Sequence, residues 1–359
     1  MGVFEQIGEG IGHEQVLFCN DPQVGLKAII AIHDTTLGPA LGGLRMWPYK
    51  SEEEAVRDVL RLSRGMTYKA AVAGLNLGGG KAVIFGDSAT DKKEALFRTL
   101  GRHVESLGGR YITAEDVGTS VQEMTWIRME TKHVAGLAED VGGSGDPSPV
   151  TALGTFAGIK ACLEAKFGTE SLKGRSVAIQ GFGNVGYHLG RYLTEAGAKI
   201  FVCDIHKHRE QLAVDEFGAE IIANEAFWGL AVDVLSPCAL GGGLNDNTIP
   251  TIKAPIVAGA ANNQLDDDER HDDMLMERGI IYAPDYVINA GGLINVYAEV
   301  YKRPRERALR DARNIQAVVG RVLAASKSQG ITPSEAADHI AKERLYMGRR
   351  LQQFRVPQR

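Results

Sequence analysis

The sequence predicts an α/β protein of two domains, the second built on a doubly wound parallel sheet. Its 359 residues are enough for two hydrophobic cores of ordinary size. Strand-like and helix-like segments alternate along most of the chain, and a run rich in glycine and proline at residues 141–149 interrupts the alternation. We therefore expect a first domain over residues 1–145, a second over 146–328, and a C-terminal helical segment over 329–359 that packs back on the first.

The first domain is expected to mix strands and helices. Residues 26–32 form an apolar run typical of a strand. Ser51 followed by Glu54 has the spacing of a capping box at a helix start, and apolar residues then recur at helical spacing up to residue 62. This combination predicts an α/β domain.

The second domain opens with a predicted helix over residues 151–167. A short buried strand at 176–180, a helix at about 184–196 and a strand at 199–203 then make one β-α-β unit. Further strand-like segments are residues 232–235, 255–258 and 280–283. Because these strands alternate with helical or loop segments, we expect them to form a parallel sheet.

The C-terminal part of the chain, residues 294–347, is predicted to be mostly helical. Its clearest break is at residues 329–333, which contain a glycine and a proline. We expect the chain to return to the first domain at this break.

Composition and charge exclude several classes of protein. Hydrophobic residues make up 44% and charged residues 24% of the chain, as in folded globular proteins. The 40 Lys and Arg against 45 Asp and Glu give a net charge of −5, so no basic field is available for a nucleic acid partner. No apolar run approaches the ~18 residues of a membrane span, and we expect no membrane partner.

The four cysteines stand far apart and form no CxxC pair; they are Cys19, Cys162, Cys203 and Cys238. This spacing favours neither a zinc site nor a disulfide framework, so we expect no metal. Unpaired cysteines are typical of a reducing compartment, which predicts a cytoplasmic protein.

Residues 181–186 match the G-x-G-x-x-G pattern of dinucleotide-binding loops. The pattern directly follows a predicted strand and opens a predicted helix. Gly181 allows the tight turn, Gly183 the approach of a pyrophosphate, and Gly186 the close packing of helix on strand. The second domain is therefore predicted to be a Rossmann domain, and its predicted cofactor-binding loop comprises Gly181, Phe182, Gly183, Asn184, Val185 and Gly186.

Asp204 ends the next predicted strand, close to the ~20-residue spacing expected for an acidic residue that binds the adenosine ribose. A carboxylate there accepts hydrogen bonds from the ribose hydroxyls and repels a 2′-phosphate, so the predicted cofactor is NAD, with Ile205 in the same site. The residues that follow are His206, Lys207, His208 and Arg209. They either reduce this repulsion or form a solvated loop.

The first domain places two lysines and an aspartate among small or apolar residues. Lys69 ends the segment GMTYK, Lys81 follows three glycines, and Asp116 ends the segment TAED. Most lysines are solvated, and an aspartate in a turn is often a cap. A buried lysine, however, has its pKa lowered toward the range useful for a base.

Four ordered segments of the chain are long enough to be recognised. They are IIAIHDTTLGPALGG at 29–43, LNLGGGK at 75–81, ITAEDVGT at 112–119 and YAPDYVINAGG at 282–292. These segments resemble the glutamate/leucine/phenylalanine/valine dehydrogenase family across nearly the whole chain, and most of all its leucine dehydrogenase branch. The resemblance implies reversible oxidative deamination of an L-amino acid to a 2-oxo acid and ammonium, with NAD as the cofactor, in a homo-oligomer.

The same resemblance implies roles for single residues. Lys69 binds the substrate carboxylate, Lys81 is the catalytic base, and Asp116 handles protons at the substrate nitrogen. Two neighbouring lysines would split their pKa values by repulsion, which agrees with one of them staying charged and the other acting as a base. Asn289 helps to position the substrate. Positions that resemble cofactor contacts are Arg45, Thr151, Ala261 and Asn262.

The remaining predicted substrate-binding residues are Leu41, Gly42, Gly43, Ala114, Leu293 and Val296. Leu41 and Val296 stand where glutamate members of the family place a lysine and a serine. A substrate side-chain carboxylate would lose several kcal/mol of hydration there, so we expect glutamate to be rejected. Ala114 and Leu293 are expected to complete an apolar pocket for leucine, isoleucine or valine.

Two alternatives remain open. Leu293 replaces the smaller valine that is frequent in the leucine branch, and a phenylalanine or other aromatic amino acid dehydrogenase is the alternative enzyme. From another class, the chain could be a catalytically inactive nucleotide-binding regulatory protein. The presence of Lys69, Lys81, Asp116 and Asn289 favours an enzyme.

Overall fold

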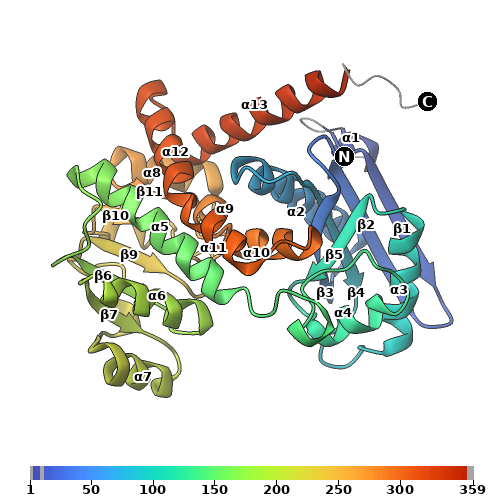
Figure 1. Cartoon of the computed structure of the whole chain (residues 1–359), viewed down its shortest axis with the longest axis horizontal. Coiled ribbons are helices and arrows are strands. Elements are labelled where there is room, and N and C mark those ends of the chain that lie inside the picture. Colours follow the sequence, from blue (N-terminus) through green and yellow to red (C-terminus); the bar gives the residue numbers. More distant parts are fainter. Residues whose placement is uncertain (1–2, 9–11, 354–359) are drawn as a thin grey trace. The chain divides into compact units, whose positions relative to one another are not determined.

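The computed structural model describes residues 3–8 and 12–353, which form two compact units (Figure 1). Unit 1 takes in the described part of Met1–Gly145 and of Ala341–Arg359, together with Glu299–Lys302. Unit 2 consists of Asp146–Ala298 and Arg303–Ile340. No helix among the described residues is long and apolar enough to cross a membrane.

Unit 1 is built on a mixed sheet of five strands in the order β1-β2-β4-β3-β5. The strands are β1 (Gln15–Asp21), β2 (Leu26–Asp34), β3 (Ala40–Trp47), β4 (Gly78–Phe85) and β5 (Tyr111–Glu115). β1 and β2 form an antiparallel hairpin, and β2 also runs antiparallel to β4. β3 is parallel to both β4 and β5 because helices connect these strands.

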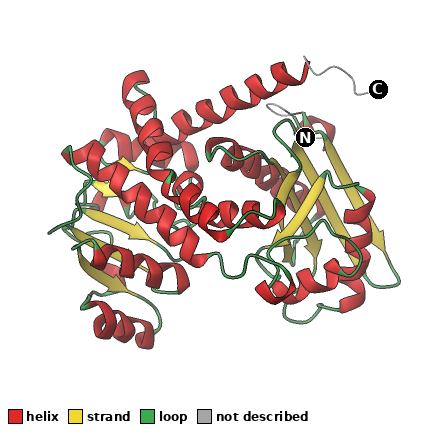
Figure 2. Cartoon of the chain, in the orientation of Figure 1, coloured by secondary structure: helices red, strands yellow, loops and turns green. Residues whose placement is uncertain are grey.

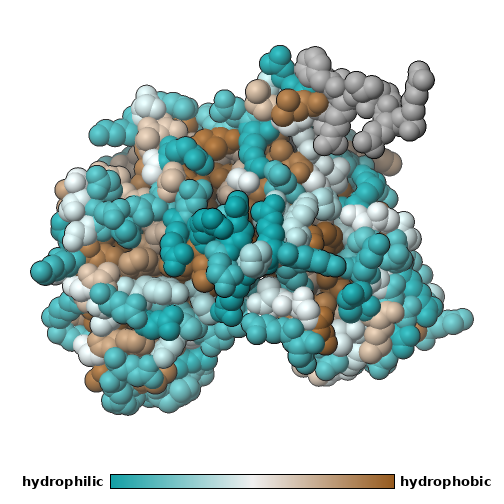
Figure 3. Space-filling model, in the orientation of Figure 1, coloured by the Kyte–Doolittle hydropathy of each residue, from teal (hydrophilic) through white to brown (hydrophobic). Residues whose placement is uncertain are grey.

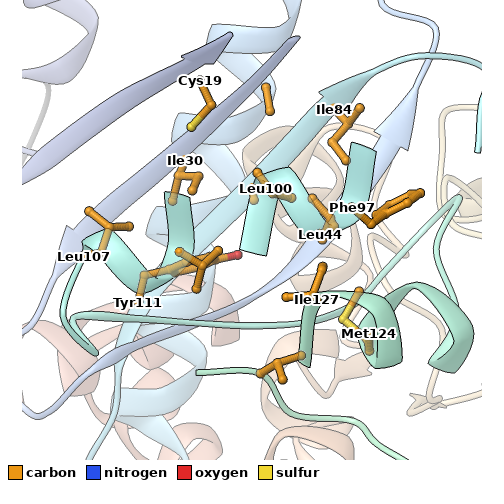
Figure 4. Packing of buried hydrophobic residues seen from close by; sticks show 14 of the residues in the cluster. Cys19, Ile30, Leu44, Ile84, Phe97, Leu100, Leu107, Tyr111, Met124 and Ile127 are labelled. Atoms are coloured by element: carbon orange, nitrogen blue, oxygen red, sulfur yellow. The ribbon is translucent and has the colours of Figure 1, made fainter. Parts of the chain in front are cut away.

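Helices cover both faces of this sheet. The helices that precede the crossing to unit 2 are α1 (Val3–Ile7), α2 (Glu52–Val72), α3 (Glu94–Ser106) and α4 (Val121–Arg128). Apolar residues of α2 pack on one face, among them Val56 and Val59 against Ile29. Residues of α3 and α4, including Phe97 and Ile127, pack on the other face in the cluster of Figure 4. The sheet is therefore buried on both sides.

The start of α2 confirms the predicted N-cap but not the complete capping box. The Ser51 hydroxyl accepts a hydrogen bond from the backbone N–H of Glu54 at 3.1 Å. The Glu54 carboxylate accepts from the N–H of Lys50, one residue before the cap, at 2.8 Å. Both bonds of a capping box are instead present at α4, between Ser120 and Glu123.

Unit 2 contains six parallel strands in the order β11-β10-β9-β6-β7-β8. The strands are β6 (Ser176–Gln180), β7 (Lys199–Cys203), β8 (Glu220–Ile221), β9 (Val234–Pro237), β10 (Ile256–Val257) and β11 (Ile281–Tyr282). The order reverses at β6, from which the chain winds outward in both directions, so the predicted doubly wound sheet is confirmed. Figure 2 shows the strands interleaved with helices.

In the described part of the chain, nine helices follow the crossing to unit 2, and most of them are longer than the strands of that unit. They are α5 (Ser148–Phe167), α6 (Asn184–Glu195), α7 (Lys207–Phe217), α8 (Asp268–Glu277), α9 (Asp285–Ile288), α10 (Gly291–Val300), α11 (Arg305–Arg313), α12 (Ile315–Gln329) and α13 (Pro333–Gln353). Single 3₁₀ turns lie at Glu139–Val141, Asn224–Ala226 and Ile249–Thr251. α5 begins three residues before the predicted start, because proline is tolerated in the first turn of a helix and Pro149 stands there.

The chain returns to unit 1 later than the sequence predicts. Gly330 ends α12 in the left-handed conformation, with φ of +68°, but α13 begins at once and its first eight residues still belong to unit 2. The return occurs at Ala341, inside the continuous helix α13. The glycine-proline break therefore marks a turn within unit 2, and Glu299–Lys302 adds a short contribution to unit 1 that the sequence does not predict.

The surface seen in Figure 3 is mostly hydrophilic, with hydrophobic residues in scattered patches. Such scatter is ordinary for a folded protein, because polar groups cannot cover the whole surface. The cysteines lie among the described residues and none of them is in a disulfide.

Candidate active site

Lys81 lies in β4, and the three glycines before it let other elements approach this strand closely. A Cβ atom at Gly79 would lie 2.2 Å from the backbone nitrogen of Thr67 in α2. A Cβ atom at Gly80 would lie 2.6 Å from the ring of Tyr111 in β5. Both distances are far below van der Waals contact, so the glycines are required for packing. β4 is thus closely packed by α2 at Gly79 and by Tyr111 at Gly80, just before Lys81.

The side chains of Lys81 and Asp116 form a short ion pair. Lys81 is 5% exposed, and its Nζ atom donates to Oδ2 of Asp116 at 2.7 Å. Asp116 follows β5, and its backbone N–H donates to the hydroxyl of Thr119, which in turn donates to the carbonyl of Leu44 in β3. These bonds fix the backbone of Asp116 relative to the sheet. Lys81 and Asp116, both predicted from the sequence, thus meet across β3, which lies between β4 and β5 in the sheet.

Burial and charge act in opposite directions on this pair. Burial lowers the pKa of Lys81 from its ordinary value, although the Asp116 charge partly offsets that effect. Burial alone would raise the pKa of Asp116, but the positive charges of Lys81 and Arg45 outweigh it and leave the pKa lowered. Asp116 therefore stays ionised, and Lys81 loses its proton more readily than a solvated lysine.

Arg45, which the sequence predicts as a cofactor contact, pairs with two carboxylates of unit 1. Its Nε atom donates to Oδ2 of Asp116 at 3.1 Å, and its Nη1 atom donates to Asp58 at 2.9 Å. Tyr49 donates its hydroxyl to the same oxygen of Asp58 at 2.7 Å. The guanidinium of Arg45 is thus occupied within unit 1 by two carboxylates. Nothing in the sequence distinguished Asp58 or Tyr49 from ordinary surface residues, and Thr119 was marked only as the last residue of the segment at 112–119.

Gly42 and Gly43 make room for this cluster. A Cβ atom at Gly43 would lie 2.7 Å from Cβ of Asp116 and 3.3 Å from Nζ of Lys81. A Cβ atom at Gly42 would lie 1.6 Å from the carbonyl oxygen of Gly80. Any side chain at these positions would separate β3 from β4 or displace the ion pair. Leu41 is buried in β3, and Ala114 is buried in β5, which pairs with β3.

Lys69 lies in the last turn of α2 and is partly buried. Thr67, two residues earlier, is the residue of α2 that contacts β4 at Gly79. The contact between Thr67 and β4 therefore fixes where the last turn of α2, and with it Lys69, lies on the sheet.

The glycines of the 181–186 loop differ in what requires them. Gly181 has φ of +89°, a conformation that other residues rarely adopt. A Cβ atom at Gly186 would lie 2.2 Å from the carbonyl oxygen of Gly181, so close packing of α6 requires this glycine. Gly183 has an ordinary φ of −74°, and a Cβ atom there would have only Nη1 of Arg209 nearby, at 3.7 Å. The fold itself does not require a glycine at 183, whereas a ligand lying against the backbone would.

The start of α6 is suited to an anion. Among the described residues no side chain caps this helix, whose N-cap is Gly183. Its first backbone N–H groups and the helix dipole favour a phosphate at this end. Asn184 is exposed and Val185 partly buried, while the ring of Phe182 is 2% exposed and packs in the core.

The carboxylate of Asp204 is hydrogen-bonded to the backbone of the glycine loop. Its side chain is almost fully buried, with Oδ2 accepting from the N–H of Phe182 at 2.7 Å and Oδ1 from the N–H of His206 at 2.8 Å. Nη1 of Arg209 lies 3.7 Å from Oδ2. Ile205 is 82% exposed beside it, an unusual position for a large apolar side chain.

The other predicted residues of unit 2 form a second group. Asn289 is 4% exposed, and its amide donates to Oδ1 of Asn262 at 2.7 Å and to the carbonyl of Ala260 at 3.3 Å. Ala261 is buried next to them. The Thr151 hydroxyl donates to the carbonyl of Pro147 in the first turn of α5. Leu293 and Val296 are three residues apart in α10, on one face of the helix.

Among the described residues, no group of three or more His, Cys, Asp or Glu is arranged to hold a metal ion.

The predicted site residues form two sets, each of which lies within one unit. Unit 1 carries the ion pair with Lys69, Leu41 and Ala114, and unit 2 carries the glycine loop with the group around Asn289.

Comparison with known protein families matches both parts of the chain. Residues 13–133 match the family model described as Glu/Leu/Phe/Val dehydrogenase, dimerisation domain. Residues 142–207 and 202–346 match the model described as Glutamate/Leucine/Phenylalanine/Valine dehydrogenase. The chain belongs to this family. Membership confirms the family predicted from the sequence and indicates a nicotinamide cofactor.

Similarity to individual members extends over almost the whole chain. The leucine dehydrogenase of Geobacillus stearothermophilus is 56% identical over 337 residues, which are 94% of this chain and 92% of that protein. The phenylalanine dehydrogenase of Lysinibacillus sphaericus is 48% identical over 348 residues, 96% of this chain and 90% of that protein. The crystal structure of the L-tryptophan dehydrogenase from Nostoc punctiforme has a TM-score of 0.88 and 46% identity, covering 97% of this chain and 99% of that chain. The chain is therefore an amino acid dehydrogenase, most like the leucine dehydrogenases, and the alternative of an inactive regulatory protein loses its support.

Proposed function

We propose that this dehydrogenase oxidises branched-chain L-amino acids, leucine above all and also isoleucine and valine, to the 2-oxo acid and ammonium, reversibly and with NAD. The buried pair of Lys81 and Asp116 carries the proposal, because it supplies a lysine that can lose its proton next to a carboxylate that stays charged. The predicted deamination needs such a pair, since water must be activated while the substrate nitrogen carries charge.

Each residue has a step that matches its chemistry. The ammonium of Lys69 holds the substrate carboxylate by charge attraction. Neutral Lys81 takes a proton from the water that attacks the imine carbon. Asp116 stabilises the charged substrate nitrogen and carries its protons, and the amide of Asn289 orients the substrate by hydrogen bonding. The tetrahedral intermediate then breaks down to the 2-oxo acid and ammonium.

The residues proposed to meet the substrate side chain are apolar in both units. Leu41 and Ala114 are 3% and 7% exposed in the sheet of unit 1, and Leu293 is 6% exposed in α10 of unit 2. Among these positions and Val296 there is no cation to pair with a substrate carboxylate. Glutamate would bring an unpaired charge into apolar surroundings, and branched aliphatic side chains bring none.

The loop of unit 2 fits a dinucleotide, as the open backbone at Gly183 and the uncapped start of α6 indicate. NAD would supply the hydride acceptor for the Cα hydrogen of the substrate. We propose that backbone N–H groups at Gly183–Val185 hold the pyrophosphate and that Asp204 selects NAD over NADP by repelling a 2′-phosphate. Ile205, Thr151, Ala261 and Asn262 are the further proposed cofactor contacts in this unit.

Initial rates on a panel of L-amino acids with NAD and with NADP test this function. We expect leucine, isoleucine and valine to give the highest kcat/KM, with NAD preferred. In Asp204→Ser the preference for NAD should fall, because a charge that repels phosphate is removed. Higher activity of the unmodified protein with NADP would contradict the role given to Asp204.

An aromatic amino acid is the second candidate substrate. The similarity to phenylalanine and L-tryptophan dehydrogenases at 48% identity favours it, as does Leu293, which differs from the usual residue of the leucine branch. An apolar pocket separates side chains that differ by a methylene or two by only ~1 to 3 kcal/mol, whereas an aromatic ring also needs a larger pocket. A higher kcat/KM for phenylalanine or tryptophan than for leucine would decide for this candidate.

Assembly and location complete the proposal. We propose a homo-oligomer, because the model matched by residues 13–133 describes a dimerisation domain. We also propose a cytoplasmic location, because the four cysteines are unpaired.

A further inference from the structure

The charged network around Asp116 extends beyond the residues assigned to the reaction. Arg45 bridges two carboxylates, those of Asp116 and Asp58, with different nitrogens of one guanidinium. Tyr49 donates to the Asp58 oxygen that also accepts from Arg45. The side chains of Arg45 and Asp58 are 19% and 17% exposed, so solvent screens them only in part. A planar guanidinium held by two carboxylates has a fixed orientation.

Lys81 and Arg45 donate to the same oxygen of Asp116, Oδ2. Within the described part of the chain, Oδ1 accepts no hydrogen bond from the protein. Oδ1 is therefore the oxygen that is available to a substrate nitrogen. This arrangement makes the position of Asp116 depend on both cations.

Deprotonation of Lys81 would remove one of the two cations. A largely buried carboxylate left without a cation is costly, so Asp116 by itself would hold the proton on Lys81. Arg45 keeps its charge over the whole range in which a lysine titrates, because an arginine in a protein does not lose its proton. Its ion pair with Asp116 therefore persists when Lys81 becomes neutral.

We propose that Arg45, anchored by Asp58 and Tyr49, is a positioning residue that keeps Asp116 ionised and in place while Lys81 releases its proton to solvent. The proposal rests on the proposed function, since it takes Lys81 as the base. It assigns Arg45 to the catalytic pair instead of to the cofactor.

Charges from three elements around β4 act on Lys81. Burial has the largest effect on its pKa and lowers it; Arg45 in β3 lowers it further, whereas Asp116 after β5 and Asp58 in α2 raise it. Removal of the Arg45 charge should therefore raise the pKa of Lys81.

Several other titratable groups on the elements packed against β4 have partners of their own. In β2, Asp34 pairs with Arg349, and His33 shares a hydrogen bond with Thr67. In β5, the Tyr111 hydroxyl donates to the carbonyl of Gly42. Further titratable groups on these elements, among them Glu115 in β5 and Arg64, Tyr68 and Lys69 in α2, stay unchanged in every variant used for the test.

The test is the pH dependence of kcat at saturating leucine and NAD in Arg45→Gln. We expect the apparent pKa on the acidic side of the profile to rise by about one unit or more, the scale of an opposite or like charge within a few ångströms. One unit below the wild-type pKa, kcat should then fall ~10-fold, and at higher pH most of it should return. Arg45→Lys, which keeps the charge, should restore most of the wild-type profile.

Arg57→Gln is the matched control. Arg57 is an exposed arginine of α2 that pairs with Glu53 at 3.5 Å, and its loss should leave kcat and the profile unchanged. Melting temperatures of all variants show whether they fold. If Arg45→Gln does not fold, Arg45→Met removes the charge while filling a similar volume.

Two results would contradict the role of Arg45, and a third would contradict the proposed function itself. A loss of kcat by the same factor at every pH, with the wild-type apparent pKa, overturns the proposal. So does a rise in KM for NAD without a change in the profile, which would make Arg45 a cofactor contact. A wild type that oxidises no amino acid at any pH contradicts the proposed function itself, whereas an active wild type with an unshifted variant contradicts only the role of Arg45.

Discussion

At the scale of single residues, the burial of Lys81 is the feature on which the chemistry depends. A lysine in water is charged at neutral pH and cannot accept a proton. The sheet of unit 1 removes Lys81 from water, and the Asp116 carboxylate prevents the burial cost from expelling the charge altogether. The pKa of Lys81 is thereby lowered from that of a solvated lysine, in the direction that a general base requires.

Lys81→Ala should reduce kcat by ~10²-fold or more, because general base catalysis is lost. Binding of NAD should change little, since the glycine loop belongs to unit 2 and Lys81 to unit 1. Steady-state rates and a fluorescence titration with NADH measure the two effects. Lys132→Ala, at an exposed lysine of the same unit, is the control. Near-normal kcat of Lys81→Ala across the pH range would rule out its role as the base.

Leu41 and Val296 should decide between aliphatic and acidic substrates. We expect leucine to exceed glutamate by at least ~10³ in kcat/KM, because a carboxylate would enter apolar surroundings unpaired. Leu41→Lys combined with Val296→Ser should lower activity on leucine and introduce measurable turnover of glutamate. Leu41→Lys alone buries an ammonium without a partner and should inactivate the enzyme, while Leu41→Met should retain activity on leucine. Unchanged selectivity of the double variant would place the specificity elsewhere.

At the scale of elements, glycines set how closely strands and helices approach. In β4 they admit Thr67 of α2 and Tyr111 of β5, and in β3 they admit the ion pair. The sequence showed these glycines as clusters, and clusters alone are equally typical of loops. Their place in strands follows from the packing of α2 and β5 on the sheet, which no local pattern records.

The loop before α6 offers a matched pair of substitutions. Gly186→Ala should destabilise the protein by roughly 1 to 3 kcal/mol, because its Cβ atom would collide with the carbonyl of Gly181. Gly183→Ala should leave stability within ~0.5 kcal/mol but weaken NAD binding, since its Cβ atom would enter the space proposed for the pyrophosphate. Urea unfolding and NADH titration measure the two effects. Equal NAD affinity in Gly183→Ala and the wild type would count against a pyrophosphate at this position.

At the scale of the whole molecule, one helix belongs to both units. α13 begins in unit 2 and its residues from Ala341 onward belong to unit 1. Arg344 donates to the carbonyl of Ala71 at 2.8 Å and to the side chain of Asn76 at 2.9 Å. Arg349 donates to the buried carboxylate of Asp34 at 2.6 Å. The C-terminal segment is thus part of the framework that holds α2 and β2.

Arg349→Ala should reduce the free energy of unfolding by about 1 to 3 kcal/mol, because it removes the cation paired with Asp34. The loss is expected in this range because the N–H of Thr36 still donates to Asp34 and because Arg349 is half exposed. Arg350→Ala, at the next exposed residue of the helix, should change stability by less than ~0.5 kcal/mol. Urea unfolding of the two variants measures the difference, and equal stabilities would show that Asp34 does not need its cation.

The sequence by itself determined the family and part of the elements. Apolar spacing, caps and the glycine loop specify β6, α6 and β7, because these patterns reflect contacts between residues near one another in the chain. The family resemblance identified Lys69, Lys81 and Asp116 as candidates. Only the tertiary structure decided that Arg45 binds Asp116 and Asp58, that β4 is a packed strand, and that the chain returns at Ala341. These features join residues far apart in the chain, and such contacts follow from how the sheet and helices pack and not from any local pattern.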